Sequence, residues 1–169
     1  MKKILLGGAI FFLAISLGLA QNDEILKLKE KIIDLQNKGE LGFRNFAFCS
    51  NIIGFGSYVP LPEPVLDKSG ELQVYYEPVN VFTNKKEGLY EIWYTQDMAL
   101  LSEKGEVLQE WPNALDFHYT TRAPVMDLFA QNSLALGNRV PAGKYKFKAV
   151  LKDKLSGKSA TKFADFEVR

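Results

Sequence analysis

The amino-acid sequence predicts an all-β, immunoglobulin-like antiparallel β-sandwich that is preceded by a signal peptide and one short amphipathic helix. Two observations on the region after Gly39 support the sandwich. Apolar residues there recur with a period of two, and aromatic and β-branched residues are frequent. Turn-forming residues follow roughly every 8 to 15 positions, which is typical of short antiparallel strands in a sandwich.

The composition agrees with one globular domain. The 169 residues are 47% hydrophobic and 24% charged, and include 13 Gly and a single Cys. These values exclude disordered, collagen-like and disulfide-rich chains. The 21 Lys and Arg residues nearly balance the 20 Asp and Glu residues. Because no strong net field results, we expect neither a nucleic acid nor an anionic membrane as partner.

Residues 1–20 have the pattern of a secretory signal peptide. Lys2 and Lys3 precede an uncharged apolar run, and small residues stand at Gly18 and Ala20, just before the expected cut. Cleavage after Ala20 removes two of the 21 basic residues, which leaves 19 against 20 acidic ones. We expect a periplasmic or secreted bacterial protein with no stable membrane span after cleavage. Retention of the segment as an anchor is the alternative.

Residues 21–40 are expected to form an amphipathic helix or linker. Asn22 or Asp23 can cap its start, and Gly39 can end it in a left-handed conformation. Spacings of three, four and three residues define an apolar stripe of Ile25, Leu28, Ile32 and Leu35. Since this stripe covers only two heptads, docking on the domain, fraying and self-association are all open.

Residues 41–169 are expected to form the β-sandwich domain. The turn residues predict hairpins at 102–105 and 155–158, where a glycine can take a positive φ. The predicted strands are 42–49, 72–81, 89–101, 106–111, 115–122, 126–136, 144–152 and 159–168.

Two segments of the domain allow a functional or a structural interpretation. Lysines alternate with apolar residues in strand 144–152, which indicates one buried and one solvated face. The lysine face either protects the strand from edge pairing or binds an anion. Alternate prolines in segment 54–64 predict an extended path. This path is either a rigid link from the first strand to the second sheet or a peptide for another protein.

Few residues could carry chemistry. Asp116 and His118 share a strand face with Thr120 and Arg122. They could hold a metal only with further ligands, so a polar outer face is the preferred interpretation. Cys49 lies in an apolar stretch and is expected to be buried, the alternatives being a reactive thiol, an intermolecular bridge or a thiol–imidazole pair with His118. We expect no catalytic residue, metal or cofactor.

Surplus aromatic residues indicate a binding surface. Strand alternation places Tyr90, Ile92 and Tyr94 on one face and Trp93 on the other. An exposed aromatic patch is typical of an interaction site. The candidate interaction surface comprises Phe55, Tyr58, Trp93, His118 and Arg122.

Several segments from residue 41 to the C-terminus carry a family resemblance. They are Phe48-Cys49, the Gly-Phe-Gly segment within 53–58, Tyr75-Tyr76-Glu77 with Asn80, and 105–107, 141–145, 157–158 and 165–168. In these segments the chain resembles an uncharacterised family of secreted bacterial proteins, most familiar from planctomycetes, with an immunoglobulin-like C-terminal half. The resemblance implies fold and compartment and no chemistry.

The sequence therefore predicts a non-enzymatic binding or adaptor module that works outside the inner membrane. Its expected partner is a protein or another component of the cell envelope. One alternative is a structural subunit that oligomerises through the N-terminal helix. Another is a metal- or thiol-dependent enzyme built on Asp116, His118 or Cys49.

Overall fold

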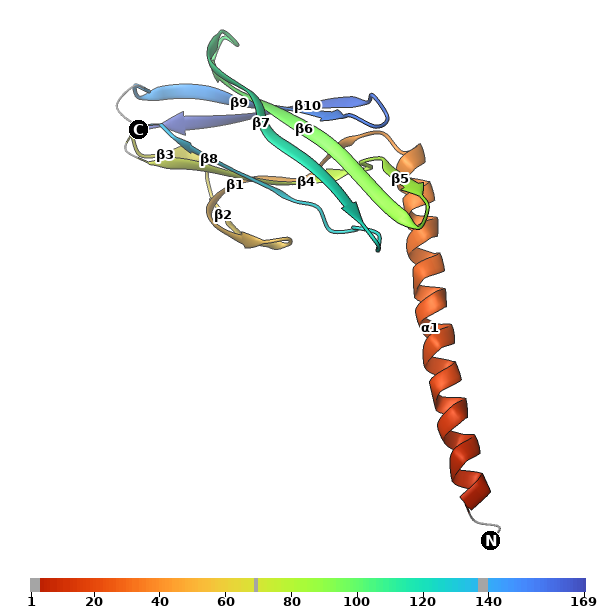
Figure 1. Cartoon of the computed structure of the whole chain (residues 1–169). Helices are drawn as coiled ribbons and strands as arrows, with labels where there is room; N and C mark the ends of the chain where they lie inside the picture. The colour runs from red at the N-terminus through yellow and green to blue at the C-terminus, as the bar shows by residue number, and fades with distance from the viewer. Residues whose placement is uncertain (1–3, 69, 137–139) are drawn as a thin grey trace.

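The predicted all-β sandwich is confirmed. The computed structural model describes residues 4–68, 70–136 and 140–169, with side chains from Gln21 onward. Within these residues a helix, α1 (Ile4–Lys38), precedes two packed sheets (Figure 1). Lys2 and Lys3 of the predicted signal peptide lie outside the described residues.

The strands form two sheets that face each other. Sheet A has the order β2-β1-β4-β8, and sheet B has the order β3-β10-β9-β6-β5, with β7 on the other side of β6. The strands of sheet A are β1 (Gly42–Gly54), β2 (Ser57–Pro60), β4 (Glu71–Val79) and β8 (Ala130–Ala135). Those of sheet B are β3 (Val65–Leu66), β5 (Thr83–Lys86), β6 (Leu89–Ser102), β7 (Val107–Thr121), β9 (Gly143–Asp153) and β10 (Ser159–Val168).

The helix ends where the sequence predicts, but neither of its expected caps is used. Asn22 and Asp23 lie inside α1, because the helix continues on both sides of them. Gly39 follows the last helical residue without a positive φ. A Cβ at Gly39 would lie 2.6 Å from side-chain atoms of Asn80, so the glycine allows the Asn80 amide to approach closely and does not serve a left-handed turn.

The structure contains three short strands that the sequence analysis did not predict. Two strands that were predicted separately form a single strand in the structure. Segments 106–111 and 115–122 both belong to β7, which bulges at Pro112 and Asn113 opposite Asp97. The Asn113 N–H donates to Asp97 Oδ1 at 2.9 Å, which compensates for the interrupted ladder. The segment predicted as strand 126–136 is a strand only at β8, whereas β2, β3 and β5 are short edge or flanking strands.

The proline segment links the sheets, as the structural interpretation predicts. Chain 54–64 leaves β1, forms the edge strand β2 of sheet A and leads to β3, the edge of sheet B. The two predicted hairpins are also confirmed, with φ of +90° at Gly105 and +75° at Gly157. The lysine face of β9 does not protect an edge, because β9 lies between β10 and β6.

A buried chain of polar side chains, which we call the polar ladder, crosses the core between the sheets. One apolar cluster surrounds Phe147 and another surrounds Ile92. Between β4, β6 and β8, the Tyr76 hydroxyl donates to Gln96 Oε1, and Gln96 Nε2 donates to Asn132 Oδ1 at 2.8 Å. All three side chains are buried. The amide of Gln96 thus joins sheet B to two strands of sheet A.

Replacing Gln96 with an apolar residue should therefore destabilise the protein. In Gln96→Leu the Tyr76 hydroxyl and the Asn132 carbonyl lose their buried partner, which should lower the free energy of unfolding by about 2–4 kcal/mol. Urea denaturation of the variant measures this loss. Adding Asn132→Leu should restore part of it, and Gln131→Leu, at an exposed position of β8, should change stability by about 0.5 kcal/mol or less. Equal losses in Gln96→Leu and Gln131→Leu would contradict the ladder's role.

Candidate binding site

The sandwich is closed along one side and open along the other. The link from β2 to β3 crosses the closed side. On the opposite side β7 is the edge of sheet B and β8 is the edge of sheet A, as Figure 1 shows. Val125 and Leu128, between these strands in sequence, pack on the Ile92 cluster and cover one end of the open side. The other end is left as a groove.

This groove has apolar walls and a volume of about 1010 Å³. Its floor is the sandwich core itself, at the buried side chains of Leu100, Leu136 and Tyr145. Leu108 and the half-buried Trp111 of β7 form one wall, and Leu134 of β8 forms part of the other; Ser102, Gln109, Ala135, Val140, Pro141 and Lys144 complete the lining. We call this site the β7–β8 groove.

The two edge strands beside the groove differ in how they are protected. The edge of β7 contains Pro112, which has no N–H to donate, and the bulge at Asn113. β8 reads Ala-Gln-Asn-Ser-Leu-Ala and has neither a charged residue nor a proline. Among the described residues, no strand pairs with the free edge of β8. The structure therefore offers one unprotected edge beside an apolar groove.

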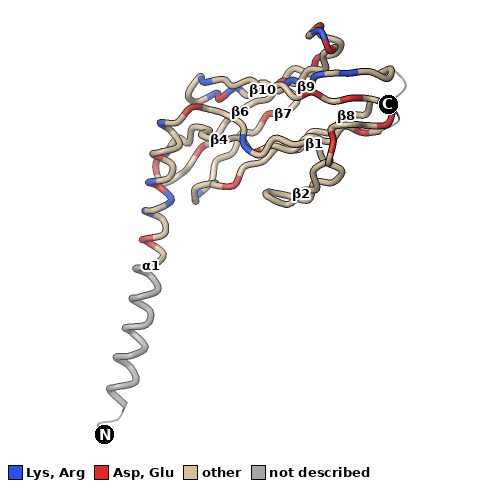
Figure 2. Tube along the Cα trace, turned by 180° about the vertical axis from the view of Figure 1, so that it is seen from behind, with Lys and Arg blue, Asp and Glu red and all other residues tan. Residues whose placement is uncertain are grey.

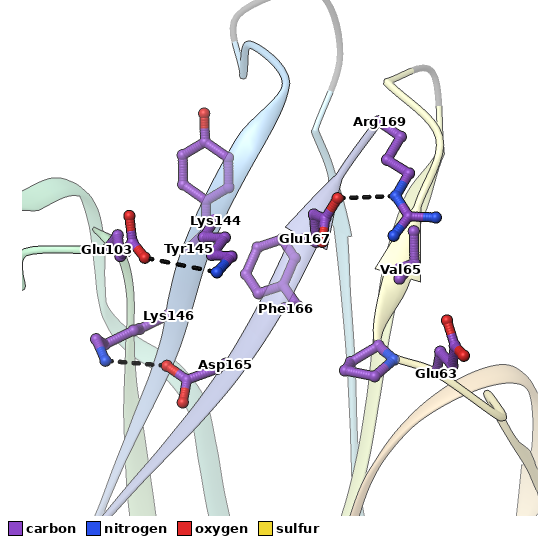
Figure 3. Close-up of a pocket in the computed structure, with 11 residues that line it drawn as sticks. Glu63, Val65, Glu103, Lys144, Tyr145, Lys146, Asp165, Phe166, Glu167 and Arg169 are labelled. Atoms are coloured by element: carbon purple, nitrogen blue, oxygen red, sulfur yellow. Dashed lines mark hydrogen bonds and ion pairs between the residues drawn. The ribbon is translucent and has the colours of Figure 1, made fainter.

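A second hollow, of about 480 Å³, lies at the outer surface of β9 and β10 and is lined by four carboxylates and three cationic side chains. Figure 3 shows its lysines and arginine turned toward carboxylates. Lys146 Nζ lies 3.0 Å from Asp165 Oδ1, and Arg169 Nε lies 2.8 Å from Glu167 Oε1. Lys144 approaches Glu103 at 3.9 Å. Because each of these cations faces a carboxylate and the carboxylates outnumber the cations, the lining does not favour an anion.

Charges are interspersed over the rest of the molecule as well. In Figure 2 basic and acidic residues alternate along the sandwich and along the coloured part of α1. This agrees with the near-zero net charge of the sequence.

Trp93 and His118 of the predicted surface lie together on the outer face of sheet B. Their rings stack with centroids 4.5 Å apart. His118 Nε2 lies 2.9 Å from Glu91 Oε1, and Trp93 Nε1 donates to Asp116 Oδ1 at 2.9 Å. The predicted separation of Trp93 from the inward-facing Tyr90, Ile92 and Tyr94 is confirmed.

Phe55 and Tyr58 lie elsewhere, on sheet A. Tyr58 stacks on the buried Tyr75 with ring centroids 4.0 Å apart, and Phe55 is exposed at the turn between β1 and β2. Arg122 is exposed just after β7. The five predicted surface residues thus occupy both sheets and do not form a single site.

The structure separates Cys49 from His118, and it gives Asp116 and His118, which share a strand face, partners other than each other. Asp116 and His118 each have another partner, Trp93 and Glu91, and no group of three or more potential metal ligands occurs among the described residues. Cys49 is buried in sheet A beside Ile52 and Tyr75, so it does not meet His118 on the outer face of sheet B. Burial raises the pKa of the Cys49 thiol.

Glu77 of β4 is a buried carboxylate that the sequence analysis did not identify. The hairpin of β1 and β2 folds over it, since the Gly56 N–H donates to the Tyr75 hydroxyl, which donates to Glu77 Oε1 at 2.8 Å. Arg44 Nε donates to Oε2 at 2.7 Å and Asn45 Nδ2 donates to Oε1 at 3.0 Å. Asn45 reaches the carboxylate from a bulge in β1, where its φ is +53°. In the sequence, the one local sign of this site is Asn45 next to Arg44, because asparagine adopts a positive φ more readily than most residues.

The electrostatics of Glu77 are those of a structural ion pair. Burial by itself would raise the pKa of the Glu77 carboxyl, but hydrogen bonds from Asn45, Tyr75 and Arg44 and the charge of Arg44 together hold this pKa below its usual value. All three residues contact the same carboxylate, and both of its oxygens accept hydrogen bonds from them. We infer that the role of Glu77 is structural: it holds the hairpin of β1 and β2 against sheet A.

Stability should depend on pH through Glu77. A carboxyl whose folded pKa is depressed contributes stability above its unfolded pKa, about 4.5, and loses it as pH falls through the folded value. At pH 7, Glu77→Gln should therefore lower the free energy of unfolding by about 1–3 kcal/mol. Denaturant titrations from pH 7 to pH 3 should show this difference shrinking. Glu103→Gln, at an exposed site, should show neither effect, and a pH-independent Glu77→Gln difference would contradict the assignment.

No family model matches the chain, and no curated protein matches it with significant similarity. No helix within the described residues has the length and apolar character needed to cross a membrane.

Proposed function

We propose that this protein is a non-enzymatic binding module that takes an extended segment of a partner protein into the β7–β8 groove. The observation that carries the proposal is the uncharged edge of β8 beside that groove. An edge strand presents free backbone N–H and C=O groups, to which an incoming strand can add. The partner's apolar side chains would then enter the groove at every second position.

The lining of the groove indicates the chemistry of the partner segment. Leu108 and Trp111 offer apolar and aromatic contacts, which are typical of the energetic centre of an interface. Among the lining residues that the structure describes, the one charged group is Lys144, which lies 3.9 Å from Glu103. A segment with alternating apolar and uncharged polar residues fits this environment better than a charged one.

Selection from a displayed library of random peptides tests the proposal. Selected peptides should alternate apolar and polar residues, and their binding should slow amide hydrogen exchange in residues 130–135. Leu108→Lys should weaken binding about tenfold or more, because it places a charge where an apolar side chain would be buried.

Phe163→Lys is the matched control for this experiment. Phe163 lies on β10 and is 53% exposed, as against 52% for Leu108, but it does not line the groove. The control should bind as the unchanged protein does. Peptides that bind Leu108→Lys undiminished, or that protect a strand other than β8, would contradict the proposal.

The proposed place of action is outside the bacterial inner membrane, in the periplasm or the medium. Support comes from residues 1–20, where two lysines, an apolar run and small residues before the cut follow in the order of a signal peptide. Mass spectrometry of the protein produced with its own N-terminus in a Gram-negative host should find a periplasmic chain beginning at Gln21. A cytoplasmic chain that keeps residues 1–20 would contradict this location.

A further inference from the structure

The part of α1 after residue 20 has two faces with different surroundings. One face contacts the sandwich at β5 and β6. The other carries the apolar stripe of Ile25, Leu28, Ile32 and Leu35, and points away from it. At 3.6 residues per turn these two sets lie on nearly opposite sides of the helix.

The contacts with the sandwich are mainly polar. Asn37 Nδ2 donates to the Thr83 carbonyl at 2.9 Å, and the Thr83 N–H donates to Asn37 Oδ1 at 2.8 Å. About two turns earlier, Glu30 Oε1 accepts from the Tyr90 hydroxyl at 2.7 Å and pairs with Lys85. Ile33, between them, is buried. The domain thus holds the last turns of α1 in helical form.

The stripe is solvent-exposed in the single chain. The exposed fractions are 45% for Ile25, 52% for Leu28, 44% for Ile32 and 70% for Leu35. The sequence left open whether this stripe docks on the domain, and the structure shows that the domain uses the opposite face. The four side chains therefore form a continuous apolar surface with no cover from the described part of the chain.

We propose that this stripe is the seam of a parallel, two-stranded coiled coil formed with a second copy of the chain. Ile25 and Ile32 take the a positions of two heptads, and Leu28 and Leu35 take the d positions. Ile at a with Leu at d favours two parallel strands. The inference is independent of the proposed peptide groove.

Charge complementarity supports a second copy in this register. With Ile25 at a, Glu24 occupies a g position and Lys29 the following e position. In a parallel pair each Glu24 lies beside Lys29 of the second copy, so two opposite-charge contacts flank the seam. The sandwich is attached at Glu30 and Asn37, which are f positions on the outside of such a pair, so it does not obstruct the approach.

The docked helix also lowers the cost of pairing. A free helix of two heptads is marginal in water because its residues must be ordered first. Here the contacts of Glu30 and Asn37 already fix the helix, so association loses less conformational entropy.

Sedimentation equilibrium over a range of concentrations tests the inference on the protein expressed with its own N-terminal segment and purified in the resulting form. The unchanged protein should reach the mass of two chains, and Leu28→Glu should remain at the mass of one. Leu26→Glu is the matched control, since Leu26 is 40% exposed on the same helix but lies at a b position. It should still form pairs. Circular dichroism should show all three forms folded, because Leu28 and Leu26 are both exposed.

Two further sets of variants test orientation and register. In a parallel pair Leu28→Cys faces its own copy and should cross-link under mild oxidation, whereas Leu26→Cys should not. Glu24→Lys should weaken association about two- to fivefold by placing like charges together, and adding Lys29→Glu should restore it.

Each other outcome overturns the proposal. A mass of one chain at every concentration rules out self-association, and a mass of three chains rules out the two-stranded seam. Pairs that form equally well with Leu28→Glu do not use the stripe. Pairs that fail to cross-link through Leu28→Cys are not parallel in this register.

Discussion

The hydrogen-bonded amide of Gln96 is the constraint on which the arrangement of the two sheets depends. It lies in the middle of β6 and joins Tyr76 of β4 to Asn132 of β8, and all three side chains are buried. Apolar packing tolerates small sliding of one sheet over the other, whereas a directional bond in a low-dielectric core does not. The ladder therefore sets the position of β8 relative to β6 and β7, and with it the width of the open side.

A second buried network acts on the outside of sheet A. Outward-facing residues of a two-layer sandwich are normally solvated, yet Tyr75, Glu77 and Cys49 are buried there. The hairpin of β1 and β2 covers them, with Tyr58 stacked on Tyr75. Both the bulge at Asn45 and the backbone of Gly56 serve this covering. Two of the residues expected to bind a partner, Phe55 and Tyr58, belong to the covering hairpin.

Local sequence patterns predict the features that depend on local physics. Alternation in β9, glycine turns at 105 and 157, burial of Cys49 and the outward position of Trp93 all follow from side-chain periodicity or backbone freedom. Features that depend on distant partners do not follow. β5 contains Lys85 and Lys86, and it becomes a strand only because β6 pairs with it. In β7, Pro112 suggests that the strand ends, but a bulge accommodates the proline and the strand continues. The burial of Glu77 and the groove arise from folding of remote segments over one another, so no short window of sequence contains them.

The two ends of β6 carry different features. Tyr90 near its start holds the helix, and Leu100 and Ser102 near its end line the groove. A paired α1 would thus leave both grooves free, each at the end of β6 opposite the helix contact. Such a pair is bivalent. When a partner presents its segments in repeated form, the second contact becomes intramolecular, and avidity can exceed the affinity of a single groove by about 10²–10⁴. A weak groove on a paired chain is consequently enough for durable attachment to a repetitive surface.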